Sequence, residues 1–145
     1  KNLFVLRSIT KTFGLASSRV GFLISHRDSI QPFKALETPY PLSLFSGKCL
    51  EFFIKNKKFL NEYNRKVKIG RDYFCKKLKI KNYLVSNGHG LSILIYLNSK
   101  KNINRIFKKL IKNKIYTKTI NVGKFNFLRI TCAPKNTMDK ILNFF

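Results

Sequence analysis

Hydrophobic positions open the chain as two short apolar runs. Residues 3–9 (LFVLRSI) have the pattern of a strand that is buried on both faces, and residues 19–25 (RVGFLIS) predict a second short strand. Between them lies a small, polar stretch, TKTFGLASS. Two strands around a turn rich in Ser and Thr indicate the edge of an α/β sheet that holds a ligand.

The pattern becomes mainly helical after these two strands. A short helix is expected over 28–37, and the PYP at 39–41 ends it because proline stops helices. From residue 43 to about residue 79, apolar positions recur at helical spacing, which predicts one long amphipathic helix or two in series. The remaining elements expected are strands at 83–85 and 91–97 around the turn Asn87-Gly88-His89-Gly90, a helix at 102–111, a strand at 125–131 and a closing helix at 137–145.

Length and composition limit the class of protein. A chain of 145 residues, 44% hydrophobic with 14 Phe, is long enough for one domain and too apolar to be disordered. No apolar run reaches the ~18–20 residues of a membrane span, so no membrane partner is expected. The three cysteines are widely spaced and favour a reducing compartment, which we expect to be the cytoplasm. Because the chain begins at Lys1 and directly with a strand pattern, we expect it to be a piece of a longer protein.

The net charge of +24 has two interpretations. Lys and Arg neutralise phosphates, so a nucleic-acid partner is one of them. However, the cations are 23 Lys and only 7 Arg, beside 14 Asn and 15 Ile, a bias typical of A/T-rich codons, and they are spread along the whole chain. We therefore expect no nucleic-acid partner. The six acids lie far apart in sequence, so we expect no carboxylate-pair hydrolysis and no metal site.

The first turn carries the candidate chemistry. Ser8, Thr10 and Lys11 follow the first strand, and Arg19 comes eight residues after the lysine. Hydroxyls, backbone N–H groups and an arginine fork suit a phosphate dianion, and a lysine in a partly buried turn can act as an imine-forming amine. On spacing alone, a solvated turn explains the same residues.

Three segments, taken in order, resemble one family. "LFVLRSITKTFGLASSRVGFLIS" is similar to the lysine segment of fold-type-I pyridoxal-phosphate (PLP) aminotransferases, in particular the histidinol-phosphate aminotransferase branch. "TPYPLSLFSGKCLEFF" resembles the stretch where that family crosses between its domains, and "FLRITCAPKNTMDKILNFF" resembles its closing strand and last helix. The resemblance implies an α/β fold, the C-terminal part of the PLP-transferase fold, with residues 1–32 ending the large PLP-binding domain and 33–145 forming an interdomain helix and an α+β small domain.

The resemblance also implies roles for individual residues. Lys11 would carry the internal aldimine with PLP and then move the proton between the substrate Cα and the cofactor. Ser8, Thr10 and Arg19 would hold the cofactor phosphate. Arg129 would bind the substrate α-carboxylate, which suits a bidentate guanidinium. The implied enzyme is a cytoplasmic, homodimeric aminotransferase of amino-acid biosynthesis that moves an amino group between an amino acid and a keto acid.

Several departures from the family pattern leave alternatives open. The family's pyridine-nitrogen aspartate, stacking aromatic and glycine-rich phosphate turn all precede the lysine, so they fall outside these residues and the 145 residues alone are expected to be inactive. Where the branch commonly has an arginine for a phosphorylated substrate, this chain has Lys118, and Ala133 replaces a glycine. A PLP-dependent decarboxylase of the threonine-phosphate type and a truncated, non-catalytic fragment remain as alternatives.

Overall fold

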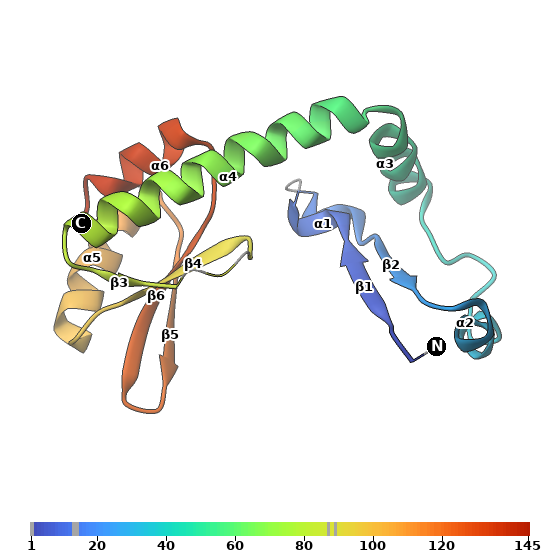
Figure 1. The fold of residues 1–145 in the computed structure, drawn as a ribbon, viewed down its shortest axis with the longest axis horizontal. Helices are drawn as coiled ribbons and strands as arrows, with labels where there is room; N and C mark the ends of the chain where they lie inside the picture. The colour runs from blue at the N-terminus through green and yellow to red at the C-terminus, as the bar shows by residue number, and fades with distance from the viewer. Residues whose placement is uncertain (1, 13–14, 87, 89) are drawn as a thin grey trace. The chain divides into compact units, whose positions relative to one another are not determined.

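The structure is a computed structural model that describes residues 2–12, 15–86, 88 and 90–145, without the side chains of Lys11 and Thr12. Contacts divide the chain into two compact units, Lys1–Asn61 (unit 1) and Glu62–Phe145 (unit 2). Unit 1 contains β1 (Val5–Ser8), α1 (Ile9–Thr12), the 3-10 turn η1 (Ala16–Ser18), β2 (Gly21–Ile24), α2 (Arg27–Lys34) and α3 (Leu44–Lys55). Helix α4 (Lys57–Ile80) begins in unit 1 and continues into unit 2, which also contains β3 (Leu84–Val85), β4 (Ser92–Tyr96), α5 (Lys100–Lys112), β5 (Lys118–Val122), β6 (Phe125–Thr131) and α6 (Lys135–Leu142) (Figure 1).

The first strand of unit 1 is largely exposed among the described residues, so its expected burial on both faces stays a prediction for the whole protein. β1 and β2 form a two-stranded antiparallel sheet in which Val5 is paired with Ile24 and Ser8 with Gly21. Leu6 is 80% exposed and Ile24 is 56% exposed. Within the described residues β1 has β2 as its only neighbouring strand.

Hydrogen bonds tie α3 to the turn that precedes β2. The Ser43 hydroxyl caps α3 by accepting the Ser46 N–H (3.1 Å), which satisfies one of the donors that a helix start leaves free. The Ser46 hydroxyl in turn donates to the carbonyl of Ser18, which is fully buried. These contacts place α3 in unit 1, and the contact-based boundary at 61/62 therefore differs from the domain boundary at 32/33, which stays a prediction.

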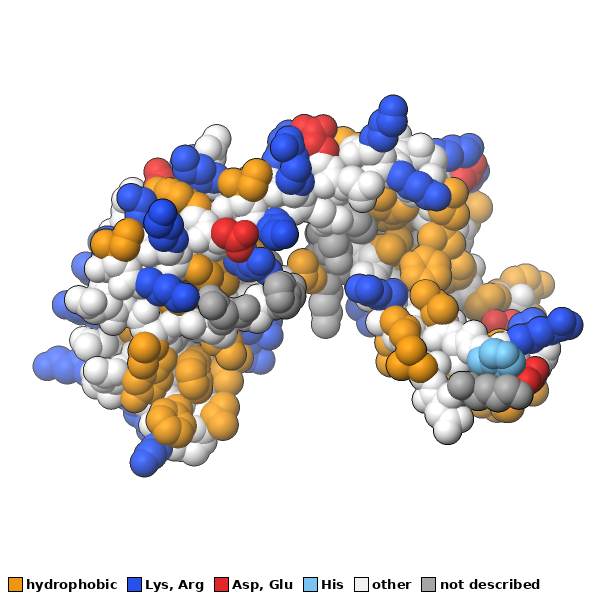
Figure 2. All heavy atoms as spheres, in the orientation of Figure 1, with side chains coloured by type: hydrophobic (Ala, Val, Ile, Leu, Met, Phe, Trp, Pro, Cys, Tyr) orange, Lys and Arg blue, Asp and Glu red, His pale blue; other side chains and the backbone are white. Residues whose placement is uncertain are grey.

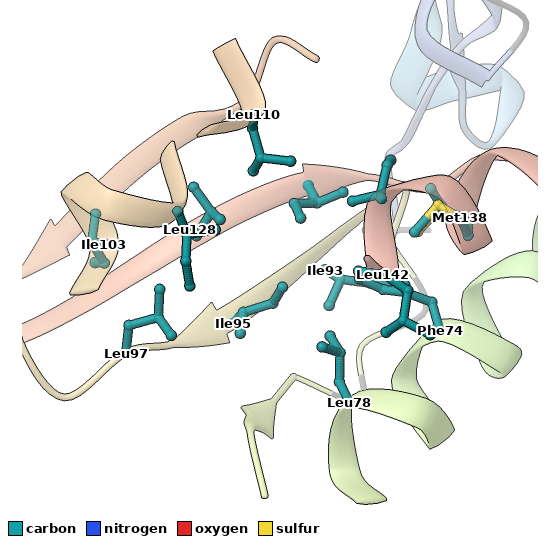
Figure 3. Close-up of a cluster of buried hydrophobic side chains, with 14 residues drawn as sticks. Phe74, Leu78, Ile93, Ile95, Leu97, Ile103, Leu110, Leu128, Met138 and Leu142 are labelled. Atoms are coloured by element: carbon teal, nitrogen blue, oxygen red, sulfur yellow. The ribbon is translucent and has the colours of Figure 1, made fainter. Parts of the chain in front are cut away.

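Unit 2 is an antiparallel sheet with helices on one face. The strand order is β3-β4-β6-β5, and alternation along β4 and β6 points Ile93, Ile95, Leu128 and Ile130 toward the helices. Side chains from α4, α5 and α6 complete this core, as Figure 3 shows for Phe74, Leu78, Ile103, Leu110, Met138 and Leu142. The opposite face of the sheet carries the alternate residues of the same strands.

One glycine allows α4 to pack closely in unit 2. A Cβ on Gly70 would lie 2.8 Å from the Lys135 nitrogen and still closer to the Ala133 carbonyl oxygen. Backbone atoms cannot rotate away as side chains do. The approach of α4 to residues 133–135 therefore requires glycine at this position.

Most expected elements are present, with different boundaries. The long helical stretch is two helices, α3 and α4, that divide at Asn56, whose side-chain amide donates to the Phe52 carbonyl (2.8 Å). α5 begins earlier than expected because Ser99 caps it. α1 and β5 were not anticipated. Asn87 and His89 of the expected turn lie outside the described residues. Among the described helices, none is long and apolar enough to cross a membrane.

Candidate functional site

Two hydroxyl side chains meet where β1 runs into α1. The Ser8 and Thr10 hydroxyl oxygens are 2.7 Å apart, and the Thr10 N–H donates to the Ser8 hydroxyl oxygen (3.3 Å). The Ser8 hydroxyl also donates to the Val20 carbonyl (3.3 Å). Thr10 is 7% exposed. The pair is thus fixed at the corner between the two strands of unit 1.

Arg19 lies at the same corner. Its backbone is left-handed (φ 48°, ψ 35°), between Ser18 and Val20, which are 0% and 2% exposed. The pairing of Ser8 with Gly21 brings residues 19–21 beside the end of β1, while the Arg19 side chain is exposed. Two buried neighbours hold the backbone, and the guanidinium stays accessible to a ligand.

This donor set fits a phosphate group. Hydroxyl hydrogens rotate, so Ser8 and Thr10 can donate to a phosphate oxygen in place of their present partners, and Arg19 supplies a charged fork. Lys11 follows Thr10 within α1, and its side chain lies outside the described part of the chain. The structure thus gathers Ser8, Thr10 and Arg19 around the backbone that carries Lys11.

Arg129 lies in unit 2, on the sheet face away from the helices. Its neighbours in β6, Leu128 and Ile130, are 0% and 1% exposed and face the core, so alternation turns the Arg129 side chain to the open face, where it is exposed. Leu94 of β4 is its partner across one side. The backbone of Arg129 therefore lies in a strand that is paired with another strand on each side.

The partner of Arg129 across the other side is Lys118 of β5. Residues directly opposite in an antiparallel pair have Cβ atoms about 4.5–5.5 Å apart and share a face. Among the described residues, neither cation has an ion-pair partner. This pairing was missed because β5 was not anticipated. The two-residue loop Gly123-Lys124 between Val122 and Phe125, with Gly123 at φ 55°, is the hairpin signal that could have found it.

The remaining reactive groups serve structural roles. Glu51 forms ion pairs with Lys48 and Lys55, and Glu62 with Lys66, all on helix surfaces. Burial raises the pKa of the Cys132 thiol to about 11, and burial also raises the pKa of Cys75. Neither thiol is therefore an activated nucleophile at neutral pH. In the residues that the structure describes, no three His, Cys, Asp or Glu side chains form a group that could hold a metal ion.

Comparison with known proteins places this geometry in a family. The family model for aminotransferase class I and II matches residues 1–145. The histidinol-phosphate aminotransferase of Clostridium novyi is 32% identical over 144 residues, which are 98% of this chain and 40% of that protein. The corresponding enzyme of Thermotoga neapolitana is 25% identical, over 98% of this chain and 41% of its own length. The chain thus spans about 40% of the length of these relatives.

Solved structures share the fold. The histidinol-phosphate aminotransferase of Sinorhizobium meliloti, in complex with pyridoxal-5'-phosphate, has a TM-score of 0.79 at 18% identity, over 98% of this chain and 40% of that one. The 8-amino-7-oxononanoate synthase of Francisella tularensis has a TM-score of 0.73 at 22% identity, over 98% and 43%. These likenesses confirm the expected fold, an α/β part of the PLP-transferase architecture. With the match of the family model to all 145 residues, the chain belongs to the class I and II aminotransferases.

Proposed function

We propose that the whole protein is a PLP-dependent aminotransferase, similar to histidinol-phosphate aminotransferase, that transfers an amino group between an amino acid and a keto compound. The observation that carries the proposal is the corner formed by Ser8, Thr10 and Arg19 around the Lys11 backbone, in a chain of the class I and II family. The fold alone does not determine which reaction is catalysed, because an 8-amino-7-oxononanoate synthase has the same fold.

Ser8, Thr10 and Arg19 would hold the phosphate of the cofactor. The two hydroxyls are held together by their mutual hydrogen bond, and the αL backbone of Arg19 lies between buried neighbours, so the hydroxyl oxygens and the Arg19 backbone are in place before the ligand binds. Preorganised donors bind an anion without the entropic cost of ordering them. When bound, PLP supplies the electron sink for bond cleavage at the substrate Cα.

Lys11 Nζ would attach covalently to the cofactor and then carry the proton to and from the substrate Cα. Its position one residue after Thr10 is the basis for this role, because Thr10 is fixed at the phosphate corner. A lysine amine forms covalent bonds with carbonyl groups, and its neutral form can accept a proton, so this residue type suits both roles.

Arg129 would bind the substrate α-carboxylate, and Lys118 would bind a second anionic group on the same substrate. Two like charges directly opposite on a sheet are unfavourable unless an anion lies between or beside them. A lysine binds an anion as a point charge, without the bidentate geometry of arginine. We therefore expect an amino acid with a second acidic group, such as a carboxylate or a phosphate ester.

Two alternatives are distinguished by their products. A PLP-dependent decarboxylase would use the same lysine and arginine but would release CO₂ and give an amine, whereas transamination retains the carboxylate. A non-catalytic chain would give neither product. We favour transamination because the relatives named above are aminotransferases. The proposed enzyme is a homodimer, and it is located in the cytoplasm, where its three free cysteines would stay reduced.

Borohydride reduction followed by mass spectrometry tests the proposal. Incubation of the native protein with PLP and borohydride should fix one adduct, and peptide mapping should place it on Lys11. Addition of an amino donor before reduction should release the cofactor from the lysine and prevent the adduct. An adduct on another lysine, or none at all, would contradict the assignment.

A further inference from the structure

Unit 2 contains a cavity with a basic lining, which the proposed function does not use. A cavity of about 660 Å³ lies between α4 and the segment that follows β3. Its lining consists of Arg71, Asp72, Cys75, Lys76, Lys79, Ile80, Ser86 and Gly88. Metabolite-sized ligands occupy cavities of about 300–1,000 Å³. The cavity is therefore large enough for a small organic molecule.

Helical geometry explains why α4 forms one wall. Residues 71, 75 and 79 are four apart and form one row along the helix, and residues 72, 76 and 80 form the adjacent row. The rows present three cations and one carboxylate to the cavity, so the lining carries net positive charge. Ile80, which is 66% exposed, and the half-buried Cys75 add an apolar patch.

Arg71 is held in place at this wall. Two of its guanidinium nitrogens donate to the same carboxylate oxygen of Asp72 (3.1 and 3.0 Å), and a third donates to the Gly88 carbonyl (3.4 Å). Its side chain is only 15% exposed. These contacts use three of the five N–H groups of the guanidinium and leave the others to bind an anion.

Ser86 supplies a donor from the opposite wall. Its hydroxyl oxygen accepts the Leu94 N–H (3.0 Å), and its own N–H donates to the Leu94 carbonyl (2.9 Å), so the residue is fixed beside β4. The hydroxyl hydrogen is available to a ligand because the bond to Leu94 uses only the oxygen. A fixed guanidinium, a fixed hydroxyl and two lysines around an apolar patch suit an anionic head with an apolar body.

We propose that this cavity binds an organic phosphate monoester, with the phosphate held by Arg71, Lys76, Lys79 and Ser86 and the apolar part against Ile80 and Cys75. The lining residues all belong to unit 2, and the corner of Ser8, Thr10 and Arg19 in unit 1 contributes none of them. Figure 2 shows Lys and Arg side chains scattered over the visible face, so the experiment must separate a site from general attraction by the charge of +24.

Cys75 provides a local reporter, because it lines the cavity. The full chain, carrying one borohydride-fixed equivalent of PLP in the proposed cofactor site and freed of excess PLP, is labelled with iodoacetamide at alkaline pH, where the raised pKa of Cys75 still allows the thiolate to form. Labelling of each cysteine is followed by mass spectrometry. Phenyl phosphate at about ten times its Kd fills roughly nine-tenths of the sites, so Cys75 labelling should slow about tenfold while Cys49 labelling is unchanged. Equal protection of Cys75 and Cys49, or no protection, would overturn the proposal.

Substitutions of lysines test which of them bind the phosphate. Lys76→Gln with Lys79→Gln should weaken phenyl phosphate binding by about tenfold or more, since it removes two charge-assisted contacts. The matched control, Lys101→Gln with Lys108→Gln on the exposed surface of α5, changes the net charge equally and should bind as the native chain does. An equal loss in both double variants would show general attraction and overturn the site. If inorganic phosphate protects Cys75 as well as phenyl phosphate does, the proposal that the ligand is organic is overturned.

Discussion

Lys118 and Arg129 stand directly opposite each other on neighbouring antiparallel strands of unit 2 and share the face that the helices leave uncovered. Each belongs to a strand whose alternate residues face the core or the open surface, so neither side chain can leave this face without a shift of register. The pair therefore places two cationic side chains at adjacent backbone positions of one face. This arrangement supports the proposed substrate with two acidic groups.

Substitution of Lys118 tests the second of these charges. Lys118→Gln should raise KM for an amino acid with a second acidic group by about tenfold, because a charge-assisted contact worth roughly 1–2 kcal/mol is lost, and should leave kcat nearly unchanged. Lys118→Arg is the matched control and should keep a low KM. Steady-state kinetics with one dianionic and one neutral-side-chain amino acid measure the effect. An equal rise in KM for both substrates would contradict the role of Lys118.

Substitution of Arg129 tests the carboxylate contact. Arg129→Lys keeps the charge but loses the bidentate fork, so KM should rise about ten- to a hundredfold for every amino-acid substrate. The same change should leave PLP affinity unaltered, because Arg129 belongs to the substrate side of the proposal. Titration of PLP absorbance and amino-donor kinetics give the two readouts. Unchanged KM values would remove Arg129 from the site.

Substitution of Thr10 tests the phosphate corner without touching Lys11. Thr10→Val retains the shape of the buried side chain but removes its hydroxyl, and with it the hydrogen bond to Ser8. The Kd for PLP should rise about tenfold, whereas the borohydride-fixed adduct on Lys11 should still form at saturating PLP. Lys11→Ala is expected to behave in the opposite way and lose the adduct altogether. A Thr10→Val protein with native PLP affinity would exclude the hydroxyl from the phosphate contact.

Gly70 offers a test of the packing of unit 2. Gly70→Ala forces a methyl group against the backbone of residues 133–135, so the free energy of unfolding should fall by about 2 kcal/mol or more. Gly47→Ala in α3 is the control, since a Cβ there meets nothing within 4 Å and should stabilise the helix by about 0.5–1 kcal/mol. Urea denaturation measures the free energy of unfolding of both variants. Equal values for the two variants would contradict the close packing at Gly70.

The sequence determined the local features of the protein. Helical spacing predicted the amphipathic stretch that became α3 and α4, and alternation predicted β6, because these periodicities follow from backbone geometry within each element. The turn signal before residue 91 predicted β4. The order of Ser8, Thr10, Lys11 and Arg19 indicated a phosphate corner and carried the family resemblance, which the family match confirmed.

Tertiary structure decided what depends on residues far apart in the chain. The pairing of Lys118 with Arg129 requires β5 to align beside β6, and the register comes from the hairpin loop and the shared core rather than from either residue. The close approach of Gly70 to residues 133–135 likewise arises only when α4 packs against the chain before α6.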